Sequence, residues 1–174
     1  MSGHTTAVAA AAPRTSVVEA MIGHVVDVTR DVFQTMVDRA VEFQAPTFGA
    51  GQPVANVVGT VGFAGSVSGY LSLCVSNEAA LEITQALLGT DLDDAPSHIR
   101  DTVGEMTNMI TGSVRSLMAD SGETMGISTP IVTMGSDFST VPPRDALQVV
   151  CTFTMGAHTL NVHLVIQGTG ASRR

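Results

Sequence analysis

The segment 101–112 carries polar residues whose types and spacing suit chemistry on one helix face. At about 100° per residue in a helix, four of them fall within about 60° of one another: Asp101, Glu105, Asn108 and Gly112. Apolar residues of the surrounding chain fall on the opposite side: Ile99, Val103, Met106, Ile110, Val114 and Leu117. The spacing predicts a helix with one face in a core and a carboxylate and a carboxamide one turn apart on the other.

Glu105 and Asn108 supply two complementary groups. The carboxamide of Asn108 both donates and accepts hydrogen bonds, so it can orient a water molecule without losing a proton. The carboxylate of Glu105 can pair with a lysine of a partner. Gly112 would let another surface come close, because it has no side chain. Glu and Asn at this spacing also form ordinary exposed helix faces, so the pair alone does not establish a site.

The order Asp-x-x-x-Glu-x-x-Asn, with Pro130 placed 22 positions after the asparagine, resembles the CheC/CheX/FliY family of chemotaxis phosphatases. The stretch Glu105–Gly112 is similar to the motif helix of that family. The stretch Ser66–Leu73, followed by Leu87-Leu88-Gly89, is similar to the segments that precede that helix. The resemblance covers roughly residues 16–167.

The resemblance implies a phosphatase that hydrolyses the aspartyl phosphate of a CheY-like response-regulator receiver domain. Asn108 would position the attacking water, and Glu105 would pair with the receiver's lysine. The Mg²⁺ ion would belong to the receiver, so neither a cofactor nor a metal site is expected on this chain. Asp101, Gly112 and Pro130 would support the site. Asp101 is expected in the first turn of its helix, where the helix dipole favours a carboxylate in any case.

The resemblance is to the CheX branch, because the chain has one Glu-x-x-Asn motif and CheC-type members carry two. The first helical segment contains Glu19 but no such motif, and Glu82 is followed three positions later by Gln85. The CheX branch implies a homodimer with one site per subunit.

Two other functions remain open. A non-catalytic CheX-like adaptor or scaffold would bind a receiver domain without hydrolysing its phosphate, since a fold does not determine a function. A small-ligand sensor with an apolar pocket has no motif behind it. The presence of both Glu105 and Asn108 favours the enzyme, because binding alone has less need of the asparagine. The sequence identifies neither the cognate receiver nor the pathway.

The charge pattern argues against several partner classes. The net charge is −8, and the eight basic residues are dispersed arginines with no lysine, whereas nucleic acid or an anionic membrane calls for a basic patch. No apolar run approaches the 18 or so residues of a membrane span, and the stretch Ala7–Ala12 is too weakly apolar for a secretion signal. We expect a cytoplasmic protein. Cys74 and Cys151 lie in alternating apolar stretches and are expected to be buried and unbridged.

Hydrophobic periodicity and turn residues divide the rest of the chain. The predicted elements are a helix from about Thr15 to Phe43, a Gly/Pro linker from Pro46 to Pro53, strands over 54–63 and 66–76, a helix from Asn77 as N-cap through Leu88, the motif helix from Ser97 as N-cap to about Ala119, and strands over 126–134, 146–155 and 159–167.

This order predicts an α+β fold in which an antiparallel β-sheet carries long helices on one face, and the resemblance implies the same, CheX-like, fold. Residues 15–167 are expected to form a single CheX-like phosphatase domain, which is long enough to bury a full core. Residues 1–14 are predicted to be a disordered arm and residues 168–174 a flexible tail.

Overall fold

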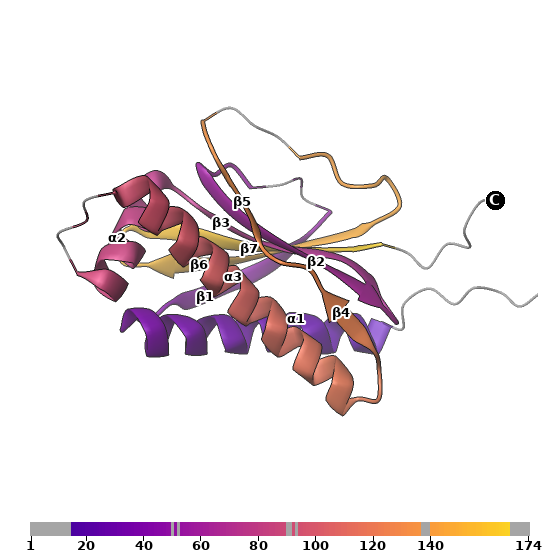
Figure 1. The fold of residues 1–174 in the computed structure, drawn as a ribbon. Coiled ribbons are helices and arrows are strands. Elements are labelled where there is room, and N and C mark those ends of the chain that lie inside the picture. Colours follow the sequence, from indigo (N-terminus) through magenta and orange to yellow (C-terminus); the bar gives the residue numbers. More distant parts are fainter. Residues whose placement is uncertain are drawn as a thin grey trace, which may run out of the picture.

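The computed structural model describes residues 15–49, 51, 53–89, 92, 94–136 and 140–167, with only the backbone at residues 15 and 16. The arm predicted for residues 1–14 and the tail predicted for residues 168–174 lie outside the described residues. Within the described chain, helices cover a seven-stranded sheet (Figure 1).

The first helix is shorter than the sequence predicts. Helix α1, Thr15–Val32, continues as a π-helical turn, η1, Phe33–Val37, and the turn ends at Asp38 with a left-handed φ of 53°. The prediction of a helix through Phe43 is therefore wrong. Phe43 is apolar because it lies in a strand and its ring packs against that of Phe153, with ring centroids 5.5 Å apart. Its place in the helical period of the sequence is therefore misleading.

The linker predicted from Pro46 to Pro53 begins instead as an edge strand. Strand β1, Glu42–Phe48, pairs antiparallel with β6, Leu147–Met155, and its register shifts between Phe43 and Pro46. Proline donates no ladder hydrogen bond, which is why it predicts a loop. An edge strand with an irregular register accommodates proline, so the linker prediction is wrong for this part of the chain.

The described strands pair antiparallel in the order β1-β6-β7-β3-β2-β4, and β5 also pairs with β2. Both predicted hairpins are confirmed. The first joins β2, Val57–Gly65, to β3, Ser68–Val75, and the second joins β6 to β7, His158–Gln167.

The single strand predicted after the motif helix is two short strands. Strands β4, Met125–Ile127, and β5, Ile131–Met134, both pair with β2. Between them, Ser128 donates its N–H to the Gly62 carbonyl at 2.9 Å and accepts the Gly62 N–H at 3.0 Å. The chain then bulges at Pro130, which has no N–H to donate.

Two helices begin earlier than predicted because other side chains cap them. Helix α2, Asn77–Leu88, is capped by Ser76, whose hydroxyl accepts a backbone N–H at 3.1 Å. Helix α3, the motif helix, spans Ala95–Asp120, and Asp94 rather than Ser97 caps it. In each helix, a side-chain oxygen of a residue before the predicted cap accepts a hydrogen bond from one of the first backbone N–H groups.

Helices α1 and α3 lie on the same face of the sheet (Figure 1), as predicted. The core fills the space between helices and strands, and its largest fully buried side chains come from both layers: Met21, Phe33, Ile83, Met106, Ile110, Leu71, Leu73, Phe153, Met155, Leu160, Leu164 and Ile166. None of the helices in the described chain is both long enough and apolar enough to cross a membrane.

The other face of the sheet carries a buried polar cluster formed by Tyr70, Gln148 and His163. Tyr70 and Gln148 both oppose Val165 of β7, two residues from His163, and the Tyr70 ring lies edge-on to the imidazole at 6.2 Å. Among the described residues, only these three have buried side-chain polar atoms without a hydrogen-bond partner. Burial disfavours the charged imidazolium and lowers the pKa of His163.

The buried neutral His163 should make the fold acid-sensitive. Below its ordinary pKa of 6.5, the unfolded chain binds a proton that the folded chain does not, so the free energy of unfolding falls as pH falls. We expect His163→Leu to lose less free energy of unfolding than wild type between about pH 7 and 5, as measured by urea unfolding. His98→Leu, at a half-buried helical position, is the control. An acid slope in His163→Leu equal to that of wild type would contradict the prediction.

Candidate functional site

Helix α3 presents the polar face that the sequence predicts. Asp101 and Glu105 are exposed, and Asn108 and Gly112 are half-buried. The apolar side is buried at Ile99, Val103, Met106, Ile110 and Val114. Leu117 shares their direction, but it lies in the last turn and is only half-buried, so the prediction was wrong there. The separation of the two faces is otherwise confirmed, whereas the roles of the polar side chains stay predictions.

Gly59 of β2 determines how closely α3 lies on the sheet. A Cβ atom at Gly59 would overlap the hydroxyl of Thr107 and lie 3.0 Å from the carbonyl oxygen of Val103. The Thr107 hydroxyl donates to that carbonyl at 2.6 Å, and the Thr111 hydroxyl donates to the Thr107 carbonyl at 2.8 Å. The buried side of α3 thus satisfies its own hydroxyl groups, as a buried polar group requires.

Pro130 and β5 cover the flank of α3 beside the motif. A Cβ atom at Gly104 would lie 3.3 Å from Val132 Cγ2 and 3.8 Å from Pro130 Cγ, so a larger residue before Glu105 would meet both. At Gly112, nothing among the described residues lies within 4 Å of such an atom. Sequence analysis missed Gly104. Its signal was a glycine inside a helix, which costs about 1 kcal/mol relative to alanine and usually has a packing reason.

Asp101 is engaged by a neighbour. Arg100 donates through Nε to Asp101 Oδ1 at 3.2 Å and through its terminal NH₂ to Ser97 Oγ at 3.1 Å. The Asp101 side chain is 71% exposed and that of Arg100 is 57% exposed, and such surface pairs contribute little to stability. The prediction that Asp101 lies in the first turn of its helix is wrong, because α3 begins two residues before Ser97, at Ala95.

Glu105 and Asn108 make no hydrogen bond or ion pair through their side chains with any part of the chain that the structure describes. They point away from the buried side of a rigid 26-residue helix. Both groups are therefore available to another molecule, and the helix holds them one turn apart.

Other reactive residue types are sequestered or engaged elsewhere. Cys74 and Cys151 are free thiols, and burial raises their pKa to about 12 and about 11, respectively, so neither is a nucleophile at neutral pH. His24 Nε2 lies 2.9 Å from Ser113 Oγ and joins α1 to α3. In the described part of the chain, no three His, Cys, Asp or Glu residues gather as a metal site would require.

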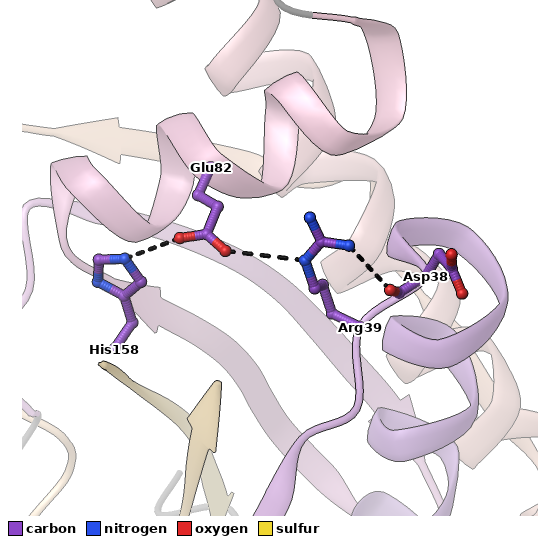
Figure 2. A network of polar contacts seen from close by, with 4 residues as sticks. All are labelled: Asp38, Arg39, Glu82 and His158. Carbon is purple, nitrogen blue, oxygen red and sulfur yellow. Dashed lines mark hydrogen bonds and ion pairs between the residues drawn. The ribbon is translucent and has the colours of Figure 1, made fainter. Parts of the chain in front are cut away.

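A separate polar network ties α2 to its neighbours (Figure 2). Glu82 of α2 pairs with His158 Nε2 at 3.0 Å and lies 3.8 Å from Arg39 Nε. Arg39 also donates to the Asp38 carbonyl at 3.0 Å, just after η1. The carboxylate of Glu82 is thus occupied within the chain, unlike that of Glu105.

Comparison with known families gives a match that covers most of the sheet and two of the helices. The family model described as chemotaxis phosphatase CheX matches residues 57–154, which is more than half of the 174-residue chain. The chain belongs to the CheX family. The matched residues include β2, β3, α2 and all of α3, so the CheX match spans the candidate site. Comparison with curated proteins gives no match.

Solved CheX structures share the fold. A CheX from Desulfovibrio desulfuricans is 25% identical, with a TM-score of 0.79 over 85% of this chain and 99% of that chain. A CheC-like superfamily protein from Shewanella sp. PV-4 is 26% identical, with a TM-score of 0.77 over 85% and 97%. CheX in a CheX–CheY–BeF3–Mg²⁺ complex from Borrelia burgdorferi is 20% identical, with a TM-score of 0.73 over 84% and 97%.

The contact at Gly59 predicts a large effect from one added methyl group. Gly59→Ala should destabilise the protein by about 1–3 kcal/mol, because Thr107 and the α3 backbone must move away. Gly62→Ala is the control on the same strand, since its Cβ would lie 3.5 Å from its nearest neighbour, Ser128 Oγ. Urea unfolding of both variants measures the difference. Equal stability of the two would contradict the proposed seating of α3.

Proposed function

We propose that this CheX-family protein hydrolyses the aspartyl phosphate of a CheY-like receiver domain, with Asn108 positioning the attacking water and Glu105 pairing with the receiver's lysine. The observation that carries the proposal is the pair itself. Both side chains lie unengaged on an outward face of α3, within the segment that matches the chemotaxis phosphatase model.

The hydrolysis requires the protein mainly to position the attacking water. An aspartyl phosphate is a reactive acyl phosphate, and its hydrolysis needs a water held in line with the bond that breaks. The carboxamide of Asn108 can accept a hydrogen bond from that water and donate another to the phosphoryl group. Asn108 is half-buried, so fewer rotamers are open to it than to a fully exposed asparagine, which favours a defined position for the water.

Glu105 suits docking better than proton transfer. Its carboxylate lies one turn before Asn108 and can form a charge-assisted hydrogen bond with an ammonium group on the partner. Asp101 lies one turn further toward the start of α3, with Arg100 holding its carboxylate. Asp101, Gly112 and Pro130 then act as supporting residues: Pro130 packs beside Gly104, and Gly112 leaves open space for the receiver.

The Borrelia burgdorferi relative supports the choice of partner, because that CheX forms a complex with CheY, BeF3 and Mg²⁺. We place the Mg²⁺ ion on the receiver in the present case too. The predicted homodimer with one motif per subunit and the cytoplasmic location belong to the same proposal. The alternative, a binding-only CheX-like adaptor, shares the fold but leaves the unengaged asparagine without a task.

Removing the carboxamide should abolish turnover and preserve the fold. We expect Asn108→Ala to reduce the rate of catalysed dephosphorylation on the order of 100-fold. The free energy of unfolding should change little, since the Asn108 side chain makes no hydrogen bond within the described chain. The assay follows loss of phosphate from a panel of phosphorylated receiver domains in the presence of Mg²⁺. Asn77→Ala, at an exposed position of α2, is the matched control.

Three outcomes of this assay are informative. Acceleration by wild type and Asn77→Ala but not by Asn108→Ala supports the phosphatase. Full activity of Asn108→Ala would contradict the water-positioning role. Binding of a phosphorylated receiver without acceleration by wild type would favour the adaptor.

A further inference from the structure

The outward face of α3 continues past the motif to a basic residue, Arg115. It lies seven residues after Asn108, which is two helical turns, so its direction differs by about 20° and its position by about 10.5 Å along the axis. Asp101, Glu105, Asn108, Gly112 and Arg115 therefore form one line along the helix, here called the motif stripe. The stripe is acidic at one end and basic at the other.

Arg115 is exposed and unengaged. Within the described chain, no hydrogen bond or ion pair involves its guanidinium, whereas Arg39 and Arg100 are both paired. The protein has no lysine and eight arginines against 16 acidic residues. Arg30 and Arg144 are also exposed and without a partner among the described residues, so Arg115 is distinguished by its alignment with the motif, where its guanidinium is available to a carboxylate of a partner.

The motif stripe offers a partner almost no apolar contact. The large apolar side chains that are exposed in the described chain all lie outside α3: Met36, Phe48, Val54, Leu88, Ile131, Met134 and Val141. Docking on the stripe itself then depends on charge and hydrogen bonding, and apolar contact is offered by the neighbouring strand β5, where Ile131 is exposed next to Pro130. Charged contacts of this kind govern association rate and partner choice, and salt weakens them.

The helix dipole does not account for the pattern. Acidic residues near the start of a helix and basic residues near its end are favoured without any partner, but the effect falls off within the first and last turns. Asp101 is the seventh residue of α3, and Arg115 is the sixth from its end. Both lie beyond the turns in which the dipole would select their charges.

We propose that Arg115 is a docking residue that pairs with carboxylates of the receiver domain, two turns from Asn108. The motif stripe then selects a partner surface that is basic opposite Glu105 and acidic opposite Arg115. This inference rests on the proposed function, because its partner is the receiver on which Asn108 acts. Arg115 touches the receiver's surface and not the phosphoryl group, so it sets affinity and specificity without entering the chemical step.

The test measures binding and turnover separately. Affinity is measured by titration calorimetry with each receiver of the panel loaded with beryllofluoride and Mg²⁺, at low and high salt. Arg115→Glu should weaken binding roughly 10-fold at low salt, equivalent to about 1.4 kcal/mol, and the loss should shrink at high salt. Arg115→Lys should retain most of the affinity. Arg30→Glu, the same charge change at an exposed position of α1, should bind like wild type.

Kinetics with the phosphorylated receiver separate docking from chemistry. Arg115→Glu should raise KM about as much as it raises Kd and leave kcat within about twofold, whereas a structural defect would lower the melting temperature and kcat together. Replacing the facing carboxylates of the receiver with arginine should restore the affinity of Arg115→Glu.

The outcomes distinguish this inference from the proposed function. Binding that depends on Arg115, without turnover by wild type, would support the docking residue and overturn the phosphatase. Turnover that depends on Asn108, with an affinity that Arg115→Glu leaves unchanged, would overturn the docking residue alone. If wild type bound no receiver of the panel, both would be overturned.

Discussion

The seating of α3 on β2 at Gly59 is the contact on which the candidate site depends. The absence of a side chain at that position lets the Thr107 hydroxyl and the backbone of α3 lie directly on the sheet. A helix held this closely cannot roll without a clash, because protein interiors are packed as densely as organic crystals. Its rotation about its own axis is thereby determined, and so is the direction in which Glu105 and Asn108 point.

A second close contact holds the same helix from the side. Gly104 brings Pro130 and Val132 against α3 immediately before Glu105, while His24 ties the helix to α1 through Ser113. The motif is thus carried by a regular helix with support on three sides and not by a loop. Rigid support of this kind suits a reaction in which the protein contributes position more than reactive groups.

Charge placement follows from the same geometry. The buried side of α3 is apolar or uses threonines that bond within the helix, so all of the helix's unpaired hydrogen-bonding capacity at the motif lies outward. In the Glu82 network, by contrast, the charged groups are engaged within the chain (Figure 2). The difference between Glu82 and Glu105 illustrates why the type of residue does not identify a site: one carboxylate has partners within the fold, and the other has none among the described residues.

The sequence by itself determined the α+β class, the two hairpins, the motif helix and the separation of its polar and apolar faces. These features depend on local periodicity, because apolar residues that repeat with the period of a helix or strand lie on one face of that element. It also determined the motif and hence the family resemblance.

The local sequence pattern gave a wrong prediction where contacts between distant segments determine the structure. The segment around Phe43 has a helical period but forms an edge strand, because Phe153 and the β6 ladder lie beside it in space. The helix starts at Ser76 and Asp94 were also missed, since several polar side chains near each start could have capped it.

Only the tertiary structure decided which glycine packs against a neighbour, which carboxylate is engaged and whether Arg115 has a partner within the fold. Gly104 and Gly112 look alike in sequence, but one meets Pro130 and the other faces open space. The physical reason is that a residue's own type fixes what it can bind, while its partners come from segments distant in the chain whose placement depends on the packing of the whole core.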